Sequence, residues 1–337
     1  MLEIITPENS EKWNAVVQSM KEYDFYHLAE YHRLDTTGKA LLFSFQHETE
    51  AFAWPVILRD IEGTDYKDIT SVYGYAGALA NVKKPSKQAI HLFQETIKAY
   101  FTENRVVSAF ARLHPLFKNQ TQLLNDWGEM AEVNITVGID LTLPEAKQKS
   151  QYAHSLRNDI NRLEKEGVQI RQAKTKEEID VFVQIYWENM RRVNASENYF
   201  FPTEYFYDFL ATIPSHLFLV YYKGKAMAGS IFTICNGIIQ THLSATKDEY
   251  LVLSPMKYVW DKIRTFGVEE KAKYIHLGGG YGGKNDTLFE FKSQFSKHRF
   301  IFKIWKYIHN QAVYEQLAAN KLKEKKSSSS FFPLYRE

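Results

Sequence analysis

Residues 216–244 read HLFLVYYKGKAMAGSIFTICNGIIQTHLS, and they carry the clearest structural signal in the chain. It holds three apolar runs (216–222, 226–234 and 238–244) with the β-branched and aromatic composition of strands. Lys223-Gly224 separates the first two runs, and Asn236-Gly237 separates the last two. Asn-Gly is a strong hairpin signal because both residues tolerate the positive φ of a tight turn. The stretch therefore predicts a three-stranded antiparallel meander.

A helix and a further strand follow this meander. Ser254-Pro255 is typical of a helix start, with serine as the N-cap and proline at the first helical position. The helix is expected to run to about Phe266, and its periodicity puts four apolar residues on one face: Met256, Val259, Trp260 and Ile263. The next strand, 273–277, can lie beside the meander in a mixed α/β sheet with a helix on its face.

The first half of the chain carries the same order of elements. Strands are predicted at 40–46, 51–58 and 69–73, followed by a helix over 86–102 and a strand over 105–112. Matching elements lie about 170 residues apart, which predicts two copies of one mixed α/β unit. We expect an N-terminal domain at 1–145 and a C-terminal domain at 146–318 that begins with helices at about 150–165 and 176–193. The basic, serine-rich segment 319–337 is expected to be a flexible tail.

Composition excludes several classes of protein. The 337 residues include 42 Lys+Arg and 40 Asp+Glu, and a net charge of +2 does not suit a protein that wraps duplex DNA. The longest uncharged stretch, 226–240, is too short for a membrane span. The N-terminus carries Glu3 and lacks the basic region of a signal peptide. We expect a cytoplasmic protein.

Metal and thiol chemistry are also disfavoured. Cys235 is the single cysteine, which excludes an intrachain disulfide and a cysteine-based zinc site. Its place in an apolar run favours a packed core thiol over a nucleophile. The 11 histidines show no metal-ligand spacing such as HExxH. We expect no metal and no tightly bound cofactor.

A glycine cluster, Gly278-Gly-Gly-Tyr-Gly-Gly-Lys-Asn285, directly follows a predicted strand. It satisfies G-x-G-x-x-G and the first seven positions of a phosphate-binding loop. However, residues 298–301 lack the acidic ribose ligand, and Asn285 stands where a Mg²⁺-binding Ser or Thr belongs. Nucleotide binding is therefore the weaker interpretation. The glycines do indicate a strand end whose backbone N–H groups, at Gly279 and Gly280, suit an oxyanion or a phosphate.

Three further segments offer polar or aromatic side chains. Residues 286–296 form an amphipathic turn in which spacing alone assigns Lys292 to solvent. The helix over 155–167 holds Arg157 and Arg162 off its apolar face. Such a face is usually solvated, but arginine is also the usual ligand of phosphate and carboxylate. The aromatic cluster 199–207 could line a substrate cleft or belong to the core.

At these residues the chain resembles the FemABX-like branch of the GNAT-fold acyltransferases, also described as BioF2-like acetyltransferase domains. The matching stretches span nearly the whole chain: 25–31, 73–79, 112–116, 155–160, 242–246 with 253–255, 276–280 and 288–295. The last of these, Leu288-Phe-Glu-Phe-Lys-Ser-Gln-Phe295, is the most specific. The resemblance implies tandem GNAT-like domains, in agreement with the duplicated order of elements.

The resemblance also implies an activity and a site. Characterised members transfer an aminoacyl group from charged tRNA to an amine of a peptidoglycan precursor, and relatives use other acyl donors. A Phe-Lys pair lies at their reaction centre and corresponds to Phe291 and Lys292. An arginine on the linking helix, here Arg157, binds substrate diphosphate. The matching stretches of the first domain add three substrate-binding positions, Tyr73, Arg112 and His114.

The chain departs from the family pattern in three places. Tyr31 and Asp35 replace a tryptophan-lysine pattern of the first domain that bears on a sugar-nucleotide acceptor. Only about ten residues separate the two linking helices, so the long helical hairpin of the tRNA-dependent enzymes is absent. Residues 247–253 lack the Q/R-x-x-G-x-G/A loop that holds the CoA pyrophosphate in ordinary GNAT enzymes.

We therefore expect an N-acyltransferase in which an acceptor amine attacks an activated acyl carbonyl in the C-terminal domain. Lys292 would add positive charge at the oxyanion. Ser254 would lie at a bare helix N-terminus that can hold a donor phosphate. Candidates for proton transfer or amine positioning are Tyr199, Tyr258, His276 and Asp286. The donor is acyl-CoA or aminoacyl-tRNA, and the acceptor is an amine of a cell-envelope precursor, an amino sugar or a peptide.

Two other classes stay open. A non-catalytic GNAT-like protein could bind a nucleotide sugar or an acyl carrier, which the missing CoA loop favours and the Phe291-Lys292 pair disfavours. A nucleotide-binding protein could use Gly278–Lys284. Charged tRNA is a candidate partner through a local basic patch, and a lipid-linked substrate would bring peripheral contact with a membrane.

Overall fold

The chain folds into two compact units in the computed structural model, which describes residues 1–280, 286–324 and 331–336. The N-terminal unit comprises Met1–Asn134 and Ile301–Glu337, and the C-terminal unit comprises Ile135–Phe300. These boundaries differ from the expected 1–145 and 146–318 because two long strands, β7 (Glu129–Asp140) and β13 (His298–Ile308), each belong partly to both units.

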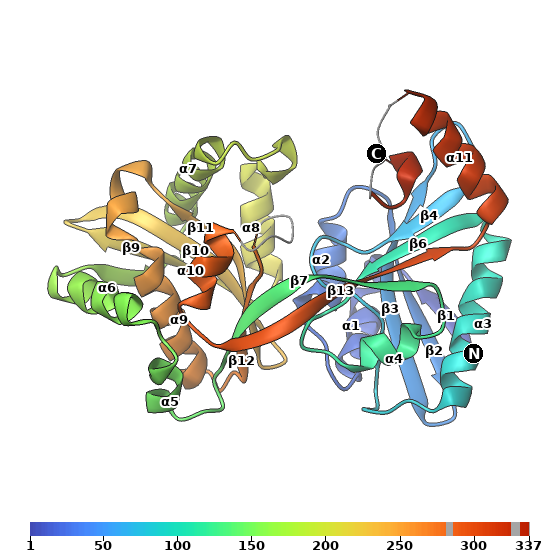
Figure 1. Ribbon diagram of the computed structural model, residues 1–337, viewed down its shortest axis with the longest axis horizontal. Helices are drawn as coiled ribbons and strands as arrows, with labels where there is room; N and C mark the ends of the chain where they lie inside the picture. The colour runs from blue at the N-terminus through green and yellow to red at the C-terminus, as the bar shows by residue number, and fades with distance from the viewer. Residues whose placement is uncertain (281–285, 325–330, 337) are drawn as a thin grey trace. The chain divides into compact units, whose positions relative to one another are not determined.

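The sheet of the N-terminal unit has the order β1-β2-β3-β4-β6-β13 (Figure 1). Its strands besides β13 are β1 (Leu2–Ile5), β2 (Lys39–His47), β3 (Glu50–Asp60), β4 (Lys67–Thr70) and β6 (Val106–Arg112). Neighbours are antiparallel except β4 and β6, and the short β5 (Leu79–Ala80) pairs with β3. The helices of this unit are α1 (Ser10–Gln18), α2 (Ala29–Arg33), α3 (Lys87–Glu103), α4 (Asn119–Leu124) and α11 (Gln311–Glu324).

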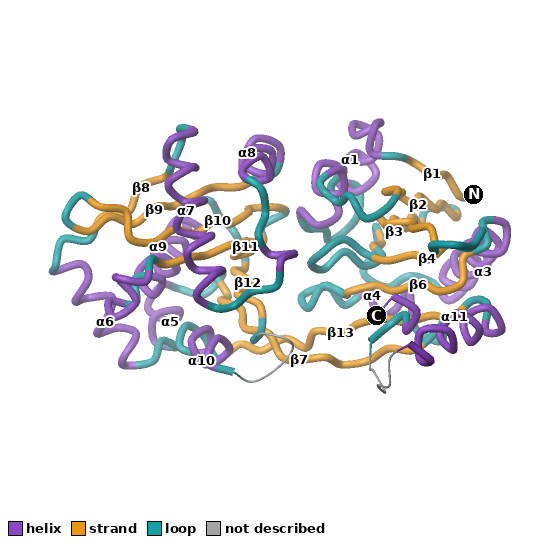
Figure 2. The backbone as a smooth tube through the Cα atoms, turned by 90° about the horizontal axis from the view of Figure 1, so that it is seen from above, coloured by secondary structure: helices purple, strands orange, loops and turns teal. Residues whose placement is uncertain are grey.

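The sheet of the C-terminal unit has the order β8-β9-β10-β11-β12-β7, and its strands can be followed in orange in Figure 2. They are β8 (Gln169–Gln172), β9 (Ser215–Tyr222), β10 (Lys225–Cys235), β11 (Ile238–Thr246), β12 (Tyr274–Gly278) and part of β7. Among these described pairs of neighbours, β11 and β12 are parallel and the others are antiparallel. The helices are α5 (Glu145–Ser150), α6 (His154–Lys165), α7 (Lys176–Arg192), α8 (Thr203–Thr212), α9 (Met256–Glu269) and α10 (Thr287–Ser293).

The two sheets repeat one pattern, as the sequence predicted. Each contains an edge strand, an antiparallel meander, a helix and a strand parallel to the end of the meander. The edge strands β1 and β8 were not predicted, and neither was the sixth strand of each sheet. It comes from the other half of the chain: Ile304–Ile308 of β13 pair with β6, and Val137–Asp140 of β7 pair with β12.

The linking segment expected as one helix over 150–165 is two helices, α5 and α6, interrupted at Gln151–Ala153. The interruption has a physical cause, because the Ala153 N–H donates to the Gln294 carbonyl (2.9 Å) and the Tyr152 hydroxyl donates to Asp261 of α9 (2.9 Å). Only β8 lies between α6 and α7, so a long helical hairpin is absent there, as expected.

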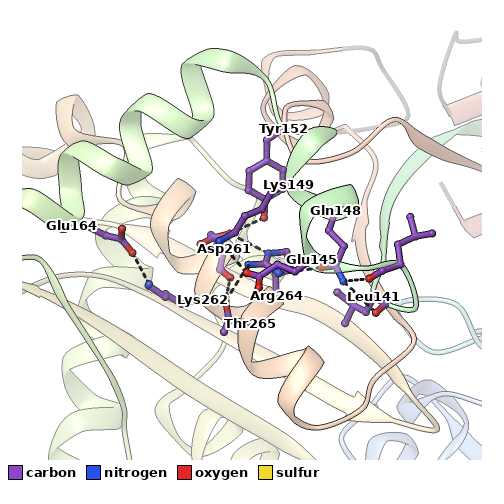
Figure 3. Close-up of polar contacts among 11 residues, drawn as sticks. Leu141, Glu145, Gln148, Lys149, Tyr152, Glu164, Asp261, Lys262, Arg264 and Thr265 are labelled. Atoms are coloured by element: carbon purple, nitrogen blue, oxygen red, sulfur yellow. Dashed lines mark hydrogen bonds and ion pairs between the residues drawn. The ribbon is translucent and has the colours of Figure 1, made fainter.

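A buried polar network ties α5 to α9 (Figure 3). Arg264 is 1% exposed and donates from Nε to Asp261 (3.1 Å), from Nη1 to Gln148 (3.1 Å) and from Nη2 to Glu145 (3.0 Å). The Gln148 amide donates in turn to the carbonyls of Leu141 and Leu143. Because each nitrogen of the guanidinium meets an acceptor, the charge is buried with compensation.

The end of the chain differs from the flexible tail that we expected. Beyond α11, residues 331–336 pack on the N-terminal unit, and Tyr335 is 7% exposed with its hydroxyl 2.7 Å from Ser108 Oγ. Arg336 Nε donates to the fully buried carboxylate of Asp68 (2.8 Å). Residues 331–336 are therefore docked rather than a free tail, because the buried Asp68 carboxylate gives the segment a charged partner. Residues 325–330 of the expected tail lie outside the described residues.

Candidate functional site

The parallel strands β11 and β12 separate part way along the C-terminal sheet. Their register runs through Ile238↔Tyr274, Ile239↔Ile275 and Gln240↔His276, whereas β11 continues beside β10 to Thr246. The four residues past this point, Thr241–Ser244, are all half-buried although they belong to an internal strand. We call this opening, Thr241–Ser244 with His276–Gly280, the fork.

A β-bulge lies at the fork. Phe232 of β10 faces Thr241 and Ile231 faces Leu243, so His242 is an extra residue on β11. Bulges bend a strand and re-aim side chains, and they are common beside active sites. The sequence analysis did not identify His242 as the extra residue of a bulge. The Asn236-Gly237 turn sets the register of the first pairs, and no local sequence signal marks where that register slips.

Lys292 of α10 reaches the end of β12. Asp286 caps α10 by accepting from the Phe289 N–H (2.9 Å), and Lys292 Nζ donates to the Gly279 carbonyl (2.6 Å). Burial lowers the pKa of Lys292 to about 8, against the opposing pull of the Asp286 carboxylate. The solvated lysine that spacing alone indicated is therefore a desolvated ammonium at the strand end.

The neighbours of Lys292 anchor α10 to the core. The ring of Phe291 lies 5.1 Å from Trp260 of α9 and 5.7 Å from Phe295, measured between centroids. Tyr258, on the same helix as Trp260, is 6% exposed, belongs to this apolar cluster and carries Lys262 Nζ 4.8 Å over its ring.

Two other candidates lie on separate elements: His276 is on β12 at the fork, and Tyr199 is in the segment between α7 and α8. His276 is 1% exposed, and its Nδ1 is 2.8 Å from Gln240 Oε1. The carbonyl of Tyr199 accepts from the Tyr186 hydroxyl of α7 (2.8 Å), which holds the aromatic segment before α8 against α7. Gly279 and Gly280 are half-buried at the end of β12.

The two arginines of α6 differ in their surroundings. Arg157 is exposed and takes part in no ion pair within the described ranges. Arg162 pairs with Asp159 and Glu166 (3.4 Å each) and donates to the Leu253 carbonyl (3.3 Å), just before α9. Arg157 is thus the α6 arginine whose charge is the less compensated of the two.

The N-terminus of α9 differs from the expectation. Ser254 is not the N-cap: it adopts a left-handed conformation (φ 51°), Pro255 takes the cap position, and this helix end has no side-chain cap. The shift follows from a 3-10 helix over Asp248–Leu253 that ends directly at Ser254.

Local bonds occupy most N–H groups at that end. Ser254 N–H donates to Leu251, Lys257 N–H to Ser254 and Tyr258 N–H to Pro255 (3.0–3.1 Å). At the start of the preceding 3-10 helix, the Asp248 N–H donates to the Glu188 carboxylate (2.8 Å). A phosphate would therefore find few unused donors here, although a helix N-terminus normally offers several.

The first-domain candidates Tyr73, Arg112 and His114 lie in the N-terminal unit. His114 is 2% exposed, and its Nε2 lies 3.1 Å from the buried carboxylate of Asp24. Burial lowers the pKa of His114 to about 3 and that of its neighbour His27 also to about 3. The Tyr73 carbonyl accepts from the Tyr31 hydroxyl (2.9 Å), and the Arg112 N–H donates to Ser71 Oγ (3.3 Å).

Several other expectations have a bearing on the site. Cys235 is buried, as expected for a core thiol. Of the Gly278–Lys284 motif, residues 281–284 lie outside the described ranges. Among the described residues, no cluster of three or more His, Cys, Asp or Glu could hold a metal, and no helix is long and apolar enough to cross a membrane.

Comparison with known proteins supports the fold. Residues 150–293 match the acetyltransferase (GNAT) domain family, whereas no curated protein sequence matches the chain. A crystal structure of FemX superposes with a TM-score of 0.75 at 12% identity, over 94% of this chain and 99% of FemX. The structure of L-PGS from Bacillus licheniformis superposes with a TM-score of 0.59 at 14% identity, over 91% of this chain and 93% of L-PGS.

A third similar structure is the C-terminal domain of a protein described as a lysylphosphatidylglycerol synthetase, from Agrobacterium fabrum. It gives a TM-score of 0.55 at 14% identity, over 94% of this chain and 96% of that one. The matched family region contains the fork, α9 and α10. The fold is thus a mixed α/β arrangement of two tandem GNAT-like domains.

Proposed function

We propose that this protein is an N-acyltransferase whose reaction centre is the fork of the C-terminal unit. The observation that carries the proposal is the desolvated Lys292 ammonium, 2.6 Å from the Gly279 carbonyl where β12 leaves β11. A positive charge with a pKa of about 8 at a strand end suits an oxyanion that forms beside it. The match of residues 150–293 to the GNAT acetyltransferase domain family supports the same assignment.

The reaction would proceed by addition and elimination. The lone pair of the acceptor amine forms a bond to the acyl carbon, and the carbonyl oxygen becomes an oxyanion beside Lys292 and the backbone of Gly279 and Gly280. The oxyanion then collapses, the bond from the acyl carbon to the leaving oxygen or sulfur breaks with its electron pair going to that atom, and the proton lost by the amine protonates the leaving group. Asp286 would hold α10, and with it Lys292, at the fork by capping the helix.

The acceptor that we propose is an amine of a cell-envelope precursor, an amino sugar or a peptide. Arg157 would bind an anionic part of it, because this exposed arginine on α6 has no described ion pair. For the donor, the occupied N–H groups at α9 disfavour CoA held by its pyrophosphate. An aminoacyl ester on tRNA is therefore the first donor to test, with acyl-CoA as the comparison, and we propose no tightly bound cofactor.

The test is transfer by a lysine variant. Purified protein is incubated with aminoacyl-tRNA or acyl-CoA and a panel of amine acceptors, and the product is detected by mass spectrometry. Lys292→Ala is expected to lower the rate by about 10²–10³, as for loss of one oxyanion-stabilising group. Lys297→Ala removes an exposed lysine five positions away and should leave the rate unchanged. Equal rates for the two variants would remove Lys292 from the mechanism.

A non-catalytic binding protein is the second candidate, and the closed N-terminus of α9 favours it. It predicts that a nucleotide sugar or an acyl carrier raises the melting temperature of the protein while no acceptor is modified with either donor. Lys292→Ala would then change neither result.

A further inference from the structure

The helix that carries Lys292 is too short to hold its own position. α10 has seven residues, and an isolated helix of that length is not stable in water. Its start is held by the Asp286 cap. Phe291 and Phe295 pack its end against Trp260, but apolar contacts are non-directional and do not fix the rotation of a helix. Directional contacts at the C-terminal end of α10 are therefore needed to set where Lys292 points.

Such contacts come from the segment between α5 and α6. The side-chain oxygen of Gln151, Oε1, accepts from the Ser296 hydroxyl (3.0 Å) and from the Lys297 N–H (3.1 Å), in the turn that follows α10. Ser296 is 1% exposed, and its hydroxyl oxygen accepts in turn from the His298 N–H (3.1 Å). One side-chain oxygen of the linking segment thus organises three consecutive residues of this turn.

The turn is joined directly to the residue that carries the ammonium. The Phe295 N–H donates to the Lys292 carbonyl (3.1 Å), and Gln294, the C-cap of α10, lies beside it. The Gln294 carbonyl accepts from the Ala153 N–H (2.9 Å), two residues after Gln151. The linking segment therefore holds both the C-cap of α10 and the turn beyond it, and the backbone of Lys292 is the next link.

The surroundings of the ammonium depend on this backbone. Lys292 Nζ donates to the Gly279 carbonyl (2.6 Å), and burial lowers its pKa to about 8 although the Asp286 carboxylate favours the charged form. A lysine side chain is long and flexible, so its ammonium stays in one place only where the backbone that carries it is fixed. Movement of the end of α10 would let water reach the ammonium.

We propose that Gln151 is a positioning residue of the transfer site: by holding the turn after α10, it keeps the Lys292 ammonium at the Gly279 carbonyl. The proposal rests on the acyltransferase function given above. Gln151 acts through α10 rather than on the reacting atoms. The segment also leads into α6, so the helix of Arg157 and the helix of Lys292 share one anchor. Small displacements of a group that stabilises a transition state are costly in rate.

The experiment measures the pKa of Lys292 without donor or acceptor. The full chain is labelled with a trace of acetic anhydride between about pH 6 and pH 10, then unfolded and labelled completely with the deuterated reagent. Mass spectrometry of the peptide that contains Lys292 gives its reactivity at each pH, and the pKa follows from the titration.

The variants differ in one contact. Gln151→Asn keeps the amide but is one methylene shorter, so its oxygen cannot reach both donors, and Ser296→Ala removes one of those donors. Gln148→Asn is the matched control. It makes the same change three positions earlier, where the amide instead contacts Arg264 and the carbonyls of Leu141 and Leu143.

In wild type and in Gln148→Asn, the pKa of Lys292 should lie near 8. Gln151→Asn and Ser296→Ala should each raise it to about 9 or higher, because water then reaches the ammonium. In the transfer assay, Gln151→Asn should lower kcat about tenfold and leave the acceptor KM unchanged.

The proposal is overturned if the pKa of Lys292 is unchanged in both variants, if Gln148→Asn raises it equally, or if Gln151→Asn leaves kcat unchanged. Labelling needs neither a donor nor an acceptor. A failure to observe transfer would therefore count against the proposed function, whereas the labelling result decides the positioning role separately.

Discussion

Replacing Arg264 by methionine should unfold the C-terminal unit at a much lower temperature. Methionine is similar in length to the aliphatic part of arginine but lacks the guanidinium that contacts Asp261, Gln148 and Glu145. Asp261 is 4% exposed and would keep the Tyr152 hydroxyl as its described side-chain partner (Figure 3). A buried carboxylate then lacks a compensating charge.

The magnitude follows from burial. Removing one member of a buried ion pair costs about 3–5 kcal/mol, whereas Glu145, whose side chain is 58% exposed, contributes little. For a unit of this size, 1 kcal/mol shifts the melting temperature by about 2–4 °C, so we expect a decrease of about 6–20 °C. The same helix offers a control: Lys262 pairs with Glu164 at 2.7 Å, with side chains 29% and 44% exposed. Lys262→Met should cost only about 1 kcal/mol or less.

The assay is thermal unfolding followed by circular dichroism and calorimetry, which resolves the transitions of the two units. The double variant Arg264→Met with Asp261→Leu should be more stable than Arg264→Met alone, because it also removes the uncompensated charge. If Arg264→Met and Lys262→Met shift the transition equally, the network in Figure 3 contributes no more than a surface ion pair, and the argument from burial fails.

Two further predictions concern the N-terminal unit. The pKa values of His27 and His114 are lowered to about 3, so the native state binds fewer protons than the unfolded state between pH 3 and 6.5. The free energy of unfolding should therefore decrease as pH falls below 6.5, by up to about 2 kcal/mol per histidine at pH 5. Equal melting temperatures at pH 7 and pH 5 would contradict this prediction. Deleting residues 331–337 removes Arg336 from the Asp68 carboxylate, which keeps Arg59 at 2.8 Å, and also removes the buried Tyr335; it should lower the free energy of unfolding of this unit by on the order of 2 kcal/mol, mainly through the lost apolar burial. Calorimetry should show the C-terminal transition unmoved, and an unchanged N-terminal transition would mean that the segment adds nothing to stability.

Much of the fold could be predicted because it is encoded locally. The Asn236-Gly237 turn and the alternation of the flanking runs set the β10–β11 hairpin, whose first pair is Cys235↔Ile238. Ser86 begins α3 as expected, because its hydroxyl accepts from the Ala89 N–H (3.1 Å). The order of elements then repeats, so the duplication is visible without any knowledge of long-range contacts.

The site was only partly predictable. A family resemblance brought Lys292 and Phe291 forward, whereas spacing alone assigned Lys292 to solvent. The desolvation of its ammonium depends on Gly279 and on the packing of Phe291 against Trp260, which are residues on separate elements. The anchor of α10 at Gln151 depends on Ser296 and Lys297, which lie 145 and 146 positions away in sequence, and no local pattern marks it.

Local patterns in the sequence were sufficient to locate the meander strands and the main helices and to show that their order occurs twice, because periodicity and turn residues act over a few positions. Long-range contacts, in contrast, set the pairing of β7 with β12 and of β13 with β6, the point where β11 separates from β12, and the docking of residues 331–336 on Asp68. These outcomes depend on strand pairing and burial between residues far apart in the chain. The free energies of such long-range contacts cannot be predicted from a local sequence pattern.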